Sequence, residues 1–589
     1  MFLVRLNSFA IRNGSKIGAI ILFFFSVNFS LFAQTKTLIL GRPTDKSVTA
    51  SILFDKKVDF YLEFGTQKGI YTSKTAVLTN TANTSNEVDM QGLAANTRYY
   101  YRLQYRLSGA TNYTPTPEYT FITQRPVGAA FTFAVESDEH LYDKKGVRSI
   151  YKLTLQNQLK EQPDFMLSLG DIFGDDHTPT TTTSKDMDDL HKDYLQYLGE
   201  VCHSMPFFVC LGNHEGENGY YLKQTPPNNI GVYGTLWRKF YYPNPIPNSF
   251  YTGNVNKEAY GMDLPANYYA WTWGDATFIV LDVYRHCDVN EKPQNWDWTL
   301  GKAQYDWFKK TLEESKSKYK FVFSHHTRGQ GRGGIATAKG FEWGGIGSKG
   351  TDEFQANRPG WDLPIHQLMV KNKVTIFFQG HDHLYAQEQL DGVVYQEVPM
   401  PADSTYQIGA LANADSYTDI TLDGTGHLNV NVSPERVKVD FVRAFLPADT
   451  KDGKHKNGEI AYSYTVGADG KFTKGVSMGN IFSYTSTGGG TGGGNGGGSG
   501  GGGGNVVLAD EPTQNDFVRV YPNPSDEKIK VEFLENVGEF RLTLINFIGQ
   551  SIVQSQSNEI DVSQVASGTY FLKIETDKKK ALRKVVINH

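Results

Sequence analysis

Cysteine is scarce in this sequence: only Cys202, Cys210 and Cys287 occur among 589 residues. An odd and low number of cysteines excludes a framework of disulfide bonds as the main source of stability. Cys210 lies in an apolar run, so we predict a buried core position for it and no catalytic role for any of the three. The domains must therefore be stabilised by hydrophobic cores, for which 39% hydrophobic residues are sufficient.

A surplus of charge of one sign is also absent. The formal net charge is -5, so nothing in the composition indicates a nucleic-acid partner beyond nucleotides as possible substrates. Aromatic residues, in contrast, make up 13% of the chain, which is typical of β-rich domains. The length exceeds that of one compact domain, and three or four units are expected.

Long apolar runs are rare as well, and a single one is long enough to be a signal peptide or a membrane anchor. It extends from Ile17 to Phe32, follows three basic residues and ends just before Ala33. This order of segments is typical of a secretory signal peptide, which we predict for residues 1–33. Because the run is marginal for a membrane-spanning helix, a retained anchor is the alternative. No other run would span a bilayer, so we expect an exported protein without a transmembrane segment after processing.

The region that follows, residues 36–125, has the pattern of a small all-β domain. Polar and apolar residues alternate in short runs such as VDFYLEFG at 58–65, with turn residues between them and no helical periodicity. The stretch GLAANTRYYYRLQY (92–105) resembles the strand-and-corner pattern of fibronectin type III domains. A fibronectin type III-like β-sandwich is therefore expected here.

The pattern changes at Phe131, where predicted strands begin to alternate with predicted helices. Strands are expected at 131–135, 164–171, 207–213, 276–282, 320–326 and 374–383, and helices at 150–162, 187–198 and 303–315. This is α/β construction, in which functional sites form at the carboxyl ends of strands. Residues 393–484 are mostly strand-like and are expected to complete the same domain, for which we predict the limits 130–486.

A glycine-rich linker at 487–505 separates this domain from the end of the chain. Between residues 488 and 504, 14 of 17 residues are glycine, so the segment is predicted to be a flexible coil. Beyond it, residues 506–589 have a compact β pattern.

The tail has a resemblance of its own, carried by VYPNPSDEKIKVEF, LINFIGQSI and SGTYFLKI, in that order. These stretches resemble the C-terminal sorting domain of the Por (type IX) secretion system of Bacteroidetes. The resemblance implies that the type IX secretion machinery is a partner and that the protein is secreted or lies at the cell surface. A small adhesive β-sandwich is the alternative.

Polar motifs follow the predicted strands of the central domain. If the chain stays extended beyond the strand, residues i and i+2 point the same way, so His381 and His383 should face one point, and Asp138 and His140 likewise. Imidazole, carboxylate and amide groups are ligands that divalent cations take, whereas a polar turn is the alternative for any one motif alone. The motifs are DEH at 138–140, GD at 170–171, GNHE at 212–215, HH at 325–326 and GHDH at 380–383.

Together these five motifs resemble those of calcineurin-like metallophosphoesterases, and within them the purple acid phosphatase-like branch, whose N-terminal domain the preceding β region also resembles. The resemblance implies a metallophosphoesterase α/β (α+β) fold with a β-sandwich core flanked by helices, preceded by an all-β sandwich and followed by a small all-β tail. It also implies two metal ions, with Fe, Zn and Mn left open. One ion would be held by Asp138, His140 and His383, the second by Asn213, His325 and His381, and both would share Asp171.

Two further roles concern histidines. His326 is the alternative to His325 as a ligand, although the order of the motifs favours His325. His214 is expected to protonate the leaving oxygen or to stabilise charge on the phosphoryl group, and a structural histidine at a strand end is the alternative.

The resulting functional prediction is an exported phosphomonoesterase of the acid phosphatase type. Two divalent ions and two carboxylates leave a charge of about +2, which attracts phosphate. Metal-bound hydroxide would attack phosphorus in line. A phosphodiesterase acting on nucleotides or lipid head groups is one alternative. A surface binding or adhesion protein with an inactive central domain is another, but the complete ligand set argues against it.

One departure from the family pattern concerns metal identity. Purple acid phosphatases carry a tyrosine three residues after the shared aspartate, where it binds ferric iron, and Gly174 occupies that position here. The metal pair is therefore open. The following Asp175 and Asp176 either approach a metal or belong to a solvated loop.

Two other segments also have alternative interpretations. Arg328 and Arg332 lie in a glycine-rich loop, where they either bind a phosphate or are solvated. The aromatic segment 220–251, with Trp237, either selects the leaving group or is an insertion with a small core of its own.

Overall fold

The structure is a computed structural model. It describes residues 35–142, 146–173, 178–327, 332–408, 416–475, 518–521, 525–534, 536–545, 551–566, 568–577 and 579–587. The predicted signal peptide and glycine-rich linker lie outside the described residues. The chain divides into two compact units, residues 1–487 and 488–589. Within the described ranges, no helix combines the length and apolar character needed to cross a membrane.

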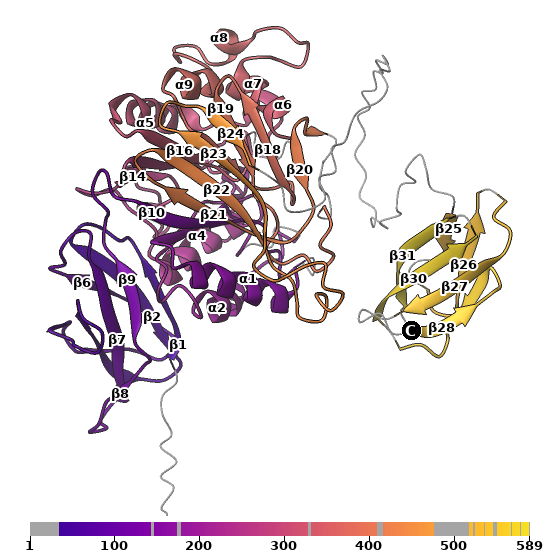
Figure 1. Ribbon diagram of the computed structural model, residues 1–589, viewed down its shortest axis with the longest axis horizontal. Coiled ribbons are helices and arrows are strands. Elements are labelled where there is room, and N and C mark those ends of the chain that lie inside the picture. The colour runs from indigo at the N-terminus through magenta and orange to yellow at the C-terminus, as the bar shows by residue number, and fades with distance from the viewer. Residues whose placement is uncertain are drawn as a thin grey trace, which may run out of the picture. The chain divides into compact units, whose positions relative to one another are not determined.

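The N-terminal region is an all-β sandwich, because its strands alternate apolar and polar residues and bury one face (Figure 1). One sheet has the order β1 (Thr35–Gly41), β2 (Ser47–Phe54), β6 (Ser85–Gln91). The other contains β3 (Val58–Gly65), β4 (Ser73–Lys74), β5 (Leu78–Thr79), β7 (Arg98–Leu107), β8 (Thr114–Pro115) and β9 (Tyr119–Ile122). Phe60, Leu62 and Leu103 are fully buried between the sheets.

This sandwich packs on the central domain. The Leu40 amide donates a hydrogen bond of 2.9 Å to the Cys202 carbonyl, and the Tyr101 hydroxyl donates one of 2.6 Å to the His203 carbonyl.

The central domain contains two mixed sheets. The first has the order β12 (Phe207–Val209), β11 (Phe165–Ser168), β10 (Phe131–Glu136), β21 (Gly426–Val432), β22 (Arg436–Arg443), β23 (Ile460–Gly467), β24 (Phe472–Lys474). The second has the order β13 (Thr252–Gly253), β14 (Tyr269–Trp273), β15 (Ala276–Val280), β16 (Tyr319–Phe323), β17 (Ile376–Gln379), β19 (Val393–Glu397), β18 (Tyr385–Leu390), β20 (Ile420–Leu422). In the first sheet β10, β11 and β12 are parallel, and in the second β15, β16, β17 and β19 are parallel.

The two sheets pack face to face around an aromatic core. The ring of Phe133 lies 5.1 Å from that of Phe278 and 5.5 Å from that of Phe321, so a strand of the first sheet contacts two strands of the second. The parallel strands are apolar on both faces because helices cover their outer sides.

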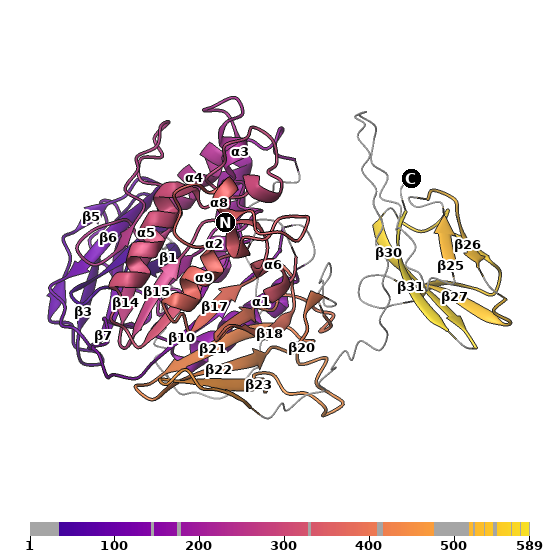
Figure 2. The ribbon, with the colours of Figure 1, turned by 90° about the horizontal axis from the view of Figure 1, so that it is seen from above.

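Helices lie on the outer sides of the parallel strands of both sheets (Figure 2). The first sheet packs against α1 (Arg148–Glu161), α2 (Ser184–Leu198) and α4 (Ile230–Tyr241), and the second against α5 (Gly301–Glu314) and α9 (Ile365–Lys371). The short helices are α3 (Gly219–Leu222), α6 (Ile335–Ala338), α7 (Phe341–Gly344), α8 (Phe354–Asn357) and the 3-10 turn η1 (Asn295–Asp297). A β-sandwich flanked by helices was predicted, and this fold class is confirmed.

Several strands end earlier than the sequence predicts. The strand expected at 207–213 ends at Val209, and the one expected at 374–383 covers only Ile376–Gln379. The polar motifs therefore lie in loops beyond the strands. In the aromatic segment, Trp237 packs beside Phe240 in a hydrophobic cluster that also contains residues of α2. This part of the segment therefore contributes to a core.

All three cysteines are buried and form no disulfide.

The second unit is a small β structure with its own core. One sheet has the order β25 (Val518–Tyr521), β26 (Lys528–Phe533), β29 (Glu559–Asp561). The other has the order β28 (Ser551–Ser555), β27 (Phe540–Ile545), β30 (Gly568–Thr576), β31 (Lys580–Ile587). Ile529, Leu542 and Leu572 are fully buried in this core.

Candidate metal centre

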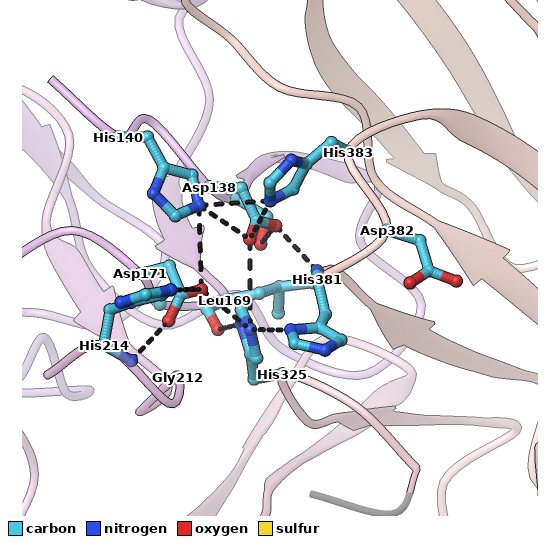
Figure 3. Close-up of polar contacts among 12 residues, drawn as sticks. Asp138, His140, Leu169, Asp171, Gly212, His214, His325, His381, Asp382 and His383 are labelled. Carbon is cyan, nitrogen blue, oxygen red and sulfur yellow. Dashed lines mark hydrogen bonds and ion pairs between the residues drawn. The ribbon is translucent and has the colours of Figure 1, made fainter. Parts of the chain in front are cut away.

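Polar side chains from both central sheets meet where the parallel strands end (Figure 3). The first sheet contributes Asp138 and His140 after β10, Asp171 after β11, and His214 after β12; the second contributes His325 after β16, and His381 and His383 after β17. Because parallel strands end at the same edge of a sheet, residues distant in the sequence are close in space.

The first group consists of Asp138, His140 and His383. The two Nε2 atoms of the histidines lie 3.1 Å apart. Asp138 Oδ1 lies 3.6 Å from Nε2 of His140 and 3.4 Å from Nε2 of His383. The three donor atoms thus surround one point in a buried environment.

The second group consists of Asp171, His325 and His381. His325 Nε2 lies 3.2 Å from Asp171 Oδ2 and 3.3 Å from His381 Nδ1. The same Asp171 Oδ2 lies 3.7 Å from His140 Nε2 of the first group. The Asp171 carboxylate therefore lies between the two groups.

His214 and Asn213 follow β12 beside this carboxylate. The His214 amide donates a hydrogen bond of 2.8 Å to Asp171 Oδ1, and its Nε2 lies 4.0 Å from Asp171 Oδ2. The His214 side chain is 16% exposed, whereas that of Asp171 is 1% exposed. Asn213 is buried, and no residue among those described hydrogen-bonds its Oδ1.

The residues fit metal ions by two criteria. Donors that bind one ion at about 2.1 Å lie about 3.0–3.4 Å from each other, close to the separations within both groups. In addition, Asp138 Oδ1 and Asn213 Oδ1 are buried oxygens without a hydrogen-bond donor among the described residues, and a bound cation would satisfy them. The assignment of each residue as a ligand remains a prediction.

The electrostatics keep the carboxylates ionised. Burial disfavours the charge of Asp138, but the imidazoles of His325, His140 and His383 close to its carboxylate outweigh this and hold the pKa of Asp138 well below its usual value. Burial also opposes the charge of Asp171, yet His325 and His214 lower the pKa of this carboxyl. Conversely, burial disfavours the charge of His325, but Asp171 and Asp138 raise its pKa to about 9. The site thus attracts positive charge.

A backbone contact orients His325. Its Nδ1 lies 3.0 Å from the Leu169 carbonyl, which selects the tautomer with a proton on Nδ1 and leaves Nε2 free to bind a metal. The alternative residue, His326, directs its Nε2 to the Gly333 carbonyl at 3.2 Å. The two histidines therefore point to different partners.

The assumption of an extended chain in the motifs is wrong. Asp138, His140, Asp171, His381 and His383 all have positive φ, from 46° for His140 to 78° for His381. Left-handed backbone at non-glycine residues is costly and is retained at functional sites. As a result, His381 and His383 do not face one point: His381 lies in the second group and His383 in the first.

The motifs also contain a supporting residue to which we assigned no role from the sequence. The buried Glu215 carboxylate accepts backbone hydrogen bonds from Gly212, Asp171, Ile172 and Phe173, at 2.5, 3.1, 2.6 and 3.2 Å. It thus connects the loops after β11 and β12. The sequence indicates this role only through the acidic residue at the end of GNHE. The backbone groups that Glu215 binds are apparent only from the fold.

The structure describes only one of the remaining residues that the sequence analysis considered for the site. Gly174, Asp175, Asp176 and Arg328 lie outside the described residues. Arg332 is described: its Nη1 contacts the backbone of His381 and the side chain of Asp382.

Comparison with known proteins agrees with this geometry. The family model of calcineurin-like phosphoesterases matches residues 131–385. Residues 131–385 carry a calcineurin-like phosphoesterase domain. This region contains all five metal-site motifs, and the match supports metal-dependent phosphoester hydrolysis. Curated proteins give no match.

Two solved structures share the fold of this chain. A structure of PhoD is 18% identical, covers 77% of this chain and 94% of its own, and has a TM-score of 0.55. A purple acid phosphatase, PPD1 from yellow lupin (Lupinus luteus) seeds, is 15% identical, covers 74% of both chains and has a TM-score of 0.50. At these identities the likeness establishes the fold.

The tail has a family of its own. Residues 519–588 match the secretion system C-terminal sorting domain. The predicted resemblance to a type IX sorting domain is therefore confirmed, and it marks the protein for export to the cell surface or the medium.

Proposed function

We propose that this protein is an exported dinuclear-metal phosphomonoesterase of the acid phosphatase type. It hydrolyses phosphomonoesters by in-line attack of hydroxide on phosphorus, without a covalent enzyme intermediate. The observation that carries the proposal is the position of Asp171, whose Oδ2 lies 3.7 Å from His140 Nε2 and 3.2 Å from His325 Nε2. One carboxylate thus adjoins both groups of imidazoles.

The ligand sets follow from the two groups. We assign Asp138, His140 and His383 to one ion, Asn213, His325 and His381 to the second, and Asp171 to both. Ions of the Fe, Zn or Mn class bind such mixed nitrogen and oxygen donors. They would supply Lewis-acid charge and a nucleophile derived from water.

The chain itself orients the substrate and handles the proton. With two divalent ions and two carboxylates the site has a charge of about +2, which attracts a phosphate dianion. His214 lies beside Asp171 and is partly exposed, so its imidazole can reach an oxygen that leaves toward solvent and donate a proton to it. Glu215 fixes the loop backbone that holds both residues.

The experiment that tests this function combines metal analysis with a substrate panel. The purified full chain, loaded with Zn, Mn or Fe, is assayed with aryl and alkyl phosphomonoesters and with the matching bis-esters. We expect two equivalents of metal in active protein and a higher kcat/KM for monoesters. Full metal loading with no monoester hydrolysis, or a preference for bis-esters, would contradict the proposal.

We further propose how the protein is exported. Residues 1–33 would direct it across the inner membrane, and the tail domain would direct it across the outer membrane through the type IX machinery.

A further inference from the structure

An arginine contacts the turn that carries two of the candidate ligands. Arg332 Nη1 donates a hydrogen bond of 2.6 Å to the carbonyl of His381, and it lies 3.1 Å from Asp382 Oδ1. Asp382 separates His381 from His383 in the sequence. The guanidinium therefore contacts the turn that carries His381 and His383, although Arg332 comes from the loop before α6.

Asp382 fixes this arginine in place. Its carboxylate is fully buried, and Oδ2 accepts hydrogen bonds from the Gly333 amide at 2.6 Å and from the Tyr417 hydroxyl at 2.7 Å. Its own amide donates to Glu397 Oε1 at 3.1 Å. In Figure 3 the Asp382 carboxylate points away from the cluster of imidazoles, so its role is to hold the arginine and the loop.

Much of the guanidinium has no hydrogen-bond partner among the described residues. Among the residues that the structure describes, only Nη1 of Arg332 has hydrogen-bond partners, so Nε and Nη2 keep their donors. The side chain is 28% exposed, whereas that of Asp382 is buried. A tethered cation with a free, solvent-accessible edge is suited to bind an anion through two parallel hydrogen bonds.

The geometry points to Arg332 as a substrate-binding residue that contacts the non-bridging oxygens of the phosphoryl group and favours monoesters over diesters. This inference rests on the proposed function. A phosphomonoester dianion has three non-bridging oxygens, whereas a diester has only two. When two oxygens face the two metal sites, a third remains for Arg332 only in the monoester. The ion pair with Asp382 keeps the guanidinium in position before the substrate arrives, which reduces the entropy lost on binding.

The test compares Arg332→Ala and Arg332→Lys with wild type in the full chain. The matched control is Arg436→Ala, because Arg436 is an exposed arginine on β22 outside the metal centre. The substrates are para-nitrophenyl phosphate and bis-para-nitrophenyl phosphate, and metal content and inhibition by inorganic phosphate are measured in parallel. Both esters release the same phenolate, so the leaving group does not differ.

We expect Arg332→Ala to lower kcat/KM for the monoester by about 10- to 100-fold and to change the value for the diester by less than about threefold. Inhibition by inorganic phosphate should weaken in parallel, metal content should stay at the wild-type level, and added guanidinium should restore part of the monoester rate. Arg332→Lys should lie between wild type and alanine.

Other outcomes would overturn the inference. Equal losses on both esters, unchanged kinetics, or loss of metal from Arg332→Ala would show that the arginine does not select the substrate. If wild type itself fails to hydrolyse the monoester while fully loaded with metal, the proposed function fails instead. The two failures are therefore distinguishable.

Discussion

The Nε2 atoms of His140 and His383 lie 3.1 Å apart although 243 residues separate them in the sequence. His140 follows a strand of the first central sheet and His383 follows a strand of the second. Two imidazole nitrogens this close in a buried site are stable when they share a proton or a cation. Residues of all five polar motifs of the central domain meet around this contact.

Asp171→Asn should remove most activity while keeping the shape of the side chain. The amide loses the negative charge that lies between the two groups, so we expect kcat/KM to fall by about three orders of magnitude and metal content to fall with it. The measurement is hydrolysis of para-nitrophenyl phosphate together with metal analysis. Asp189→Asn, at an exposed position of α2, is the control, and wild-type rates in Asp171→Asn would contradict the assignment.

His214→Asn should affect chemistry more than metal binding. Loss of a proton donor lowers kcat by about 10²- to 10⁴-fold for alkyl phosphates, whose leaving oxygen needs a proton. The loss should be smaller for para-nitrophenyl phosphate, because that phenolate leaves without one. The check is kcat across leaving groups of different pKa, with exposed His286→Asn as the control. A loss that is the same for every leaving group would argue against proton donation.

Glu215→Gln should destabilise the loops that support the site. In wild type the carboxylate accepts hydrogen bonds from backbone N–H groups. The NH2 of glutamine is itself a donor and would face these N–H groups, so we expect the free energy of unfolding to fall by about 3 kcal/mol. Metal affinity should fall by about 10- to 100-fold, as for other residues that support ligands. Urea unfolding and metal titration measure the two effects, with exposed Glu200→Gln as the control. Unchanged unfolding would show that these hydrogen bonds are dispensable.

Removal of metal should lower thermal stability. A ligand present at about 100 times its Kd stabilises the native state by about 2.7 kcal/mol per site. Chelation should therefore lower Tm, and readdition of Zn or Mn should restore it in a concentration-dependent manner. Scanning calorimetry of the full chain gives the result, and a Tm that is independent of metal would contradict a folded metal centre.

Deletion of residues 506–589 should separate export from catalysis. We expect the truncated protein to hydrolyse phosphomonoesters as wild type does, because the tail forms a compact unit with its own core. In cells it should accumulate inside the outer membrane instead of reaching the surface or the medium. Fractionation and immunodetection test this, and normal release without the tail would refute the sorting role proposed for it.

The sequence predicted the parts of the fold that depend on local pattern. The strands predicted at 131–135 and 276–282 are found at Phe131–Glu136 and Ala276–Val280, since a run that is apolar on both faces must be covered by helices and a second sheet. The resemblance of the motifs to calcineurin-like metallophosphoesterases implied that Asp138 and His383 share one group, and their donor atoms do lie together. The strand positions needed only periodicity, and the location of the site needed only the rule that sites form at the carboxyl ends of strands.

Other features were not predictable because they depend on tertiary contacts. The left-handed backbone at Asp138 and His381 follows from tight loops held by neighbouring segments, for example by the hydrogen bond of 2.8 Å from the His381 amide to Asp138 Oδ2. The four amide partners of Glu215 come from two loops, and Asp382 is buried by Tyr417 and Arg332. No local pattern predicts such partners.

The origin of the ligands in two different sheets has a thermodynamic consequence. Each group of donors is complete only while Phe133 and its aromatic neighbours hold the sheets in register, and a bound cation in turn favours that register. Affinity for metal and tight packing of the interior are therefore linked quantities. A substitution deep in the aromatic layer, far from any phosphate, should raise the dissociation constant for metal. By the same linkage, a given concentration of metal should then stabilise the protein less against unfolding.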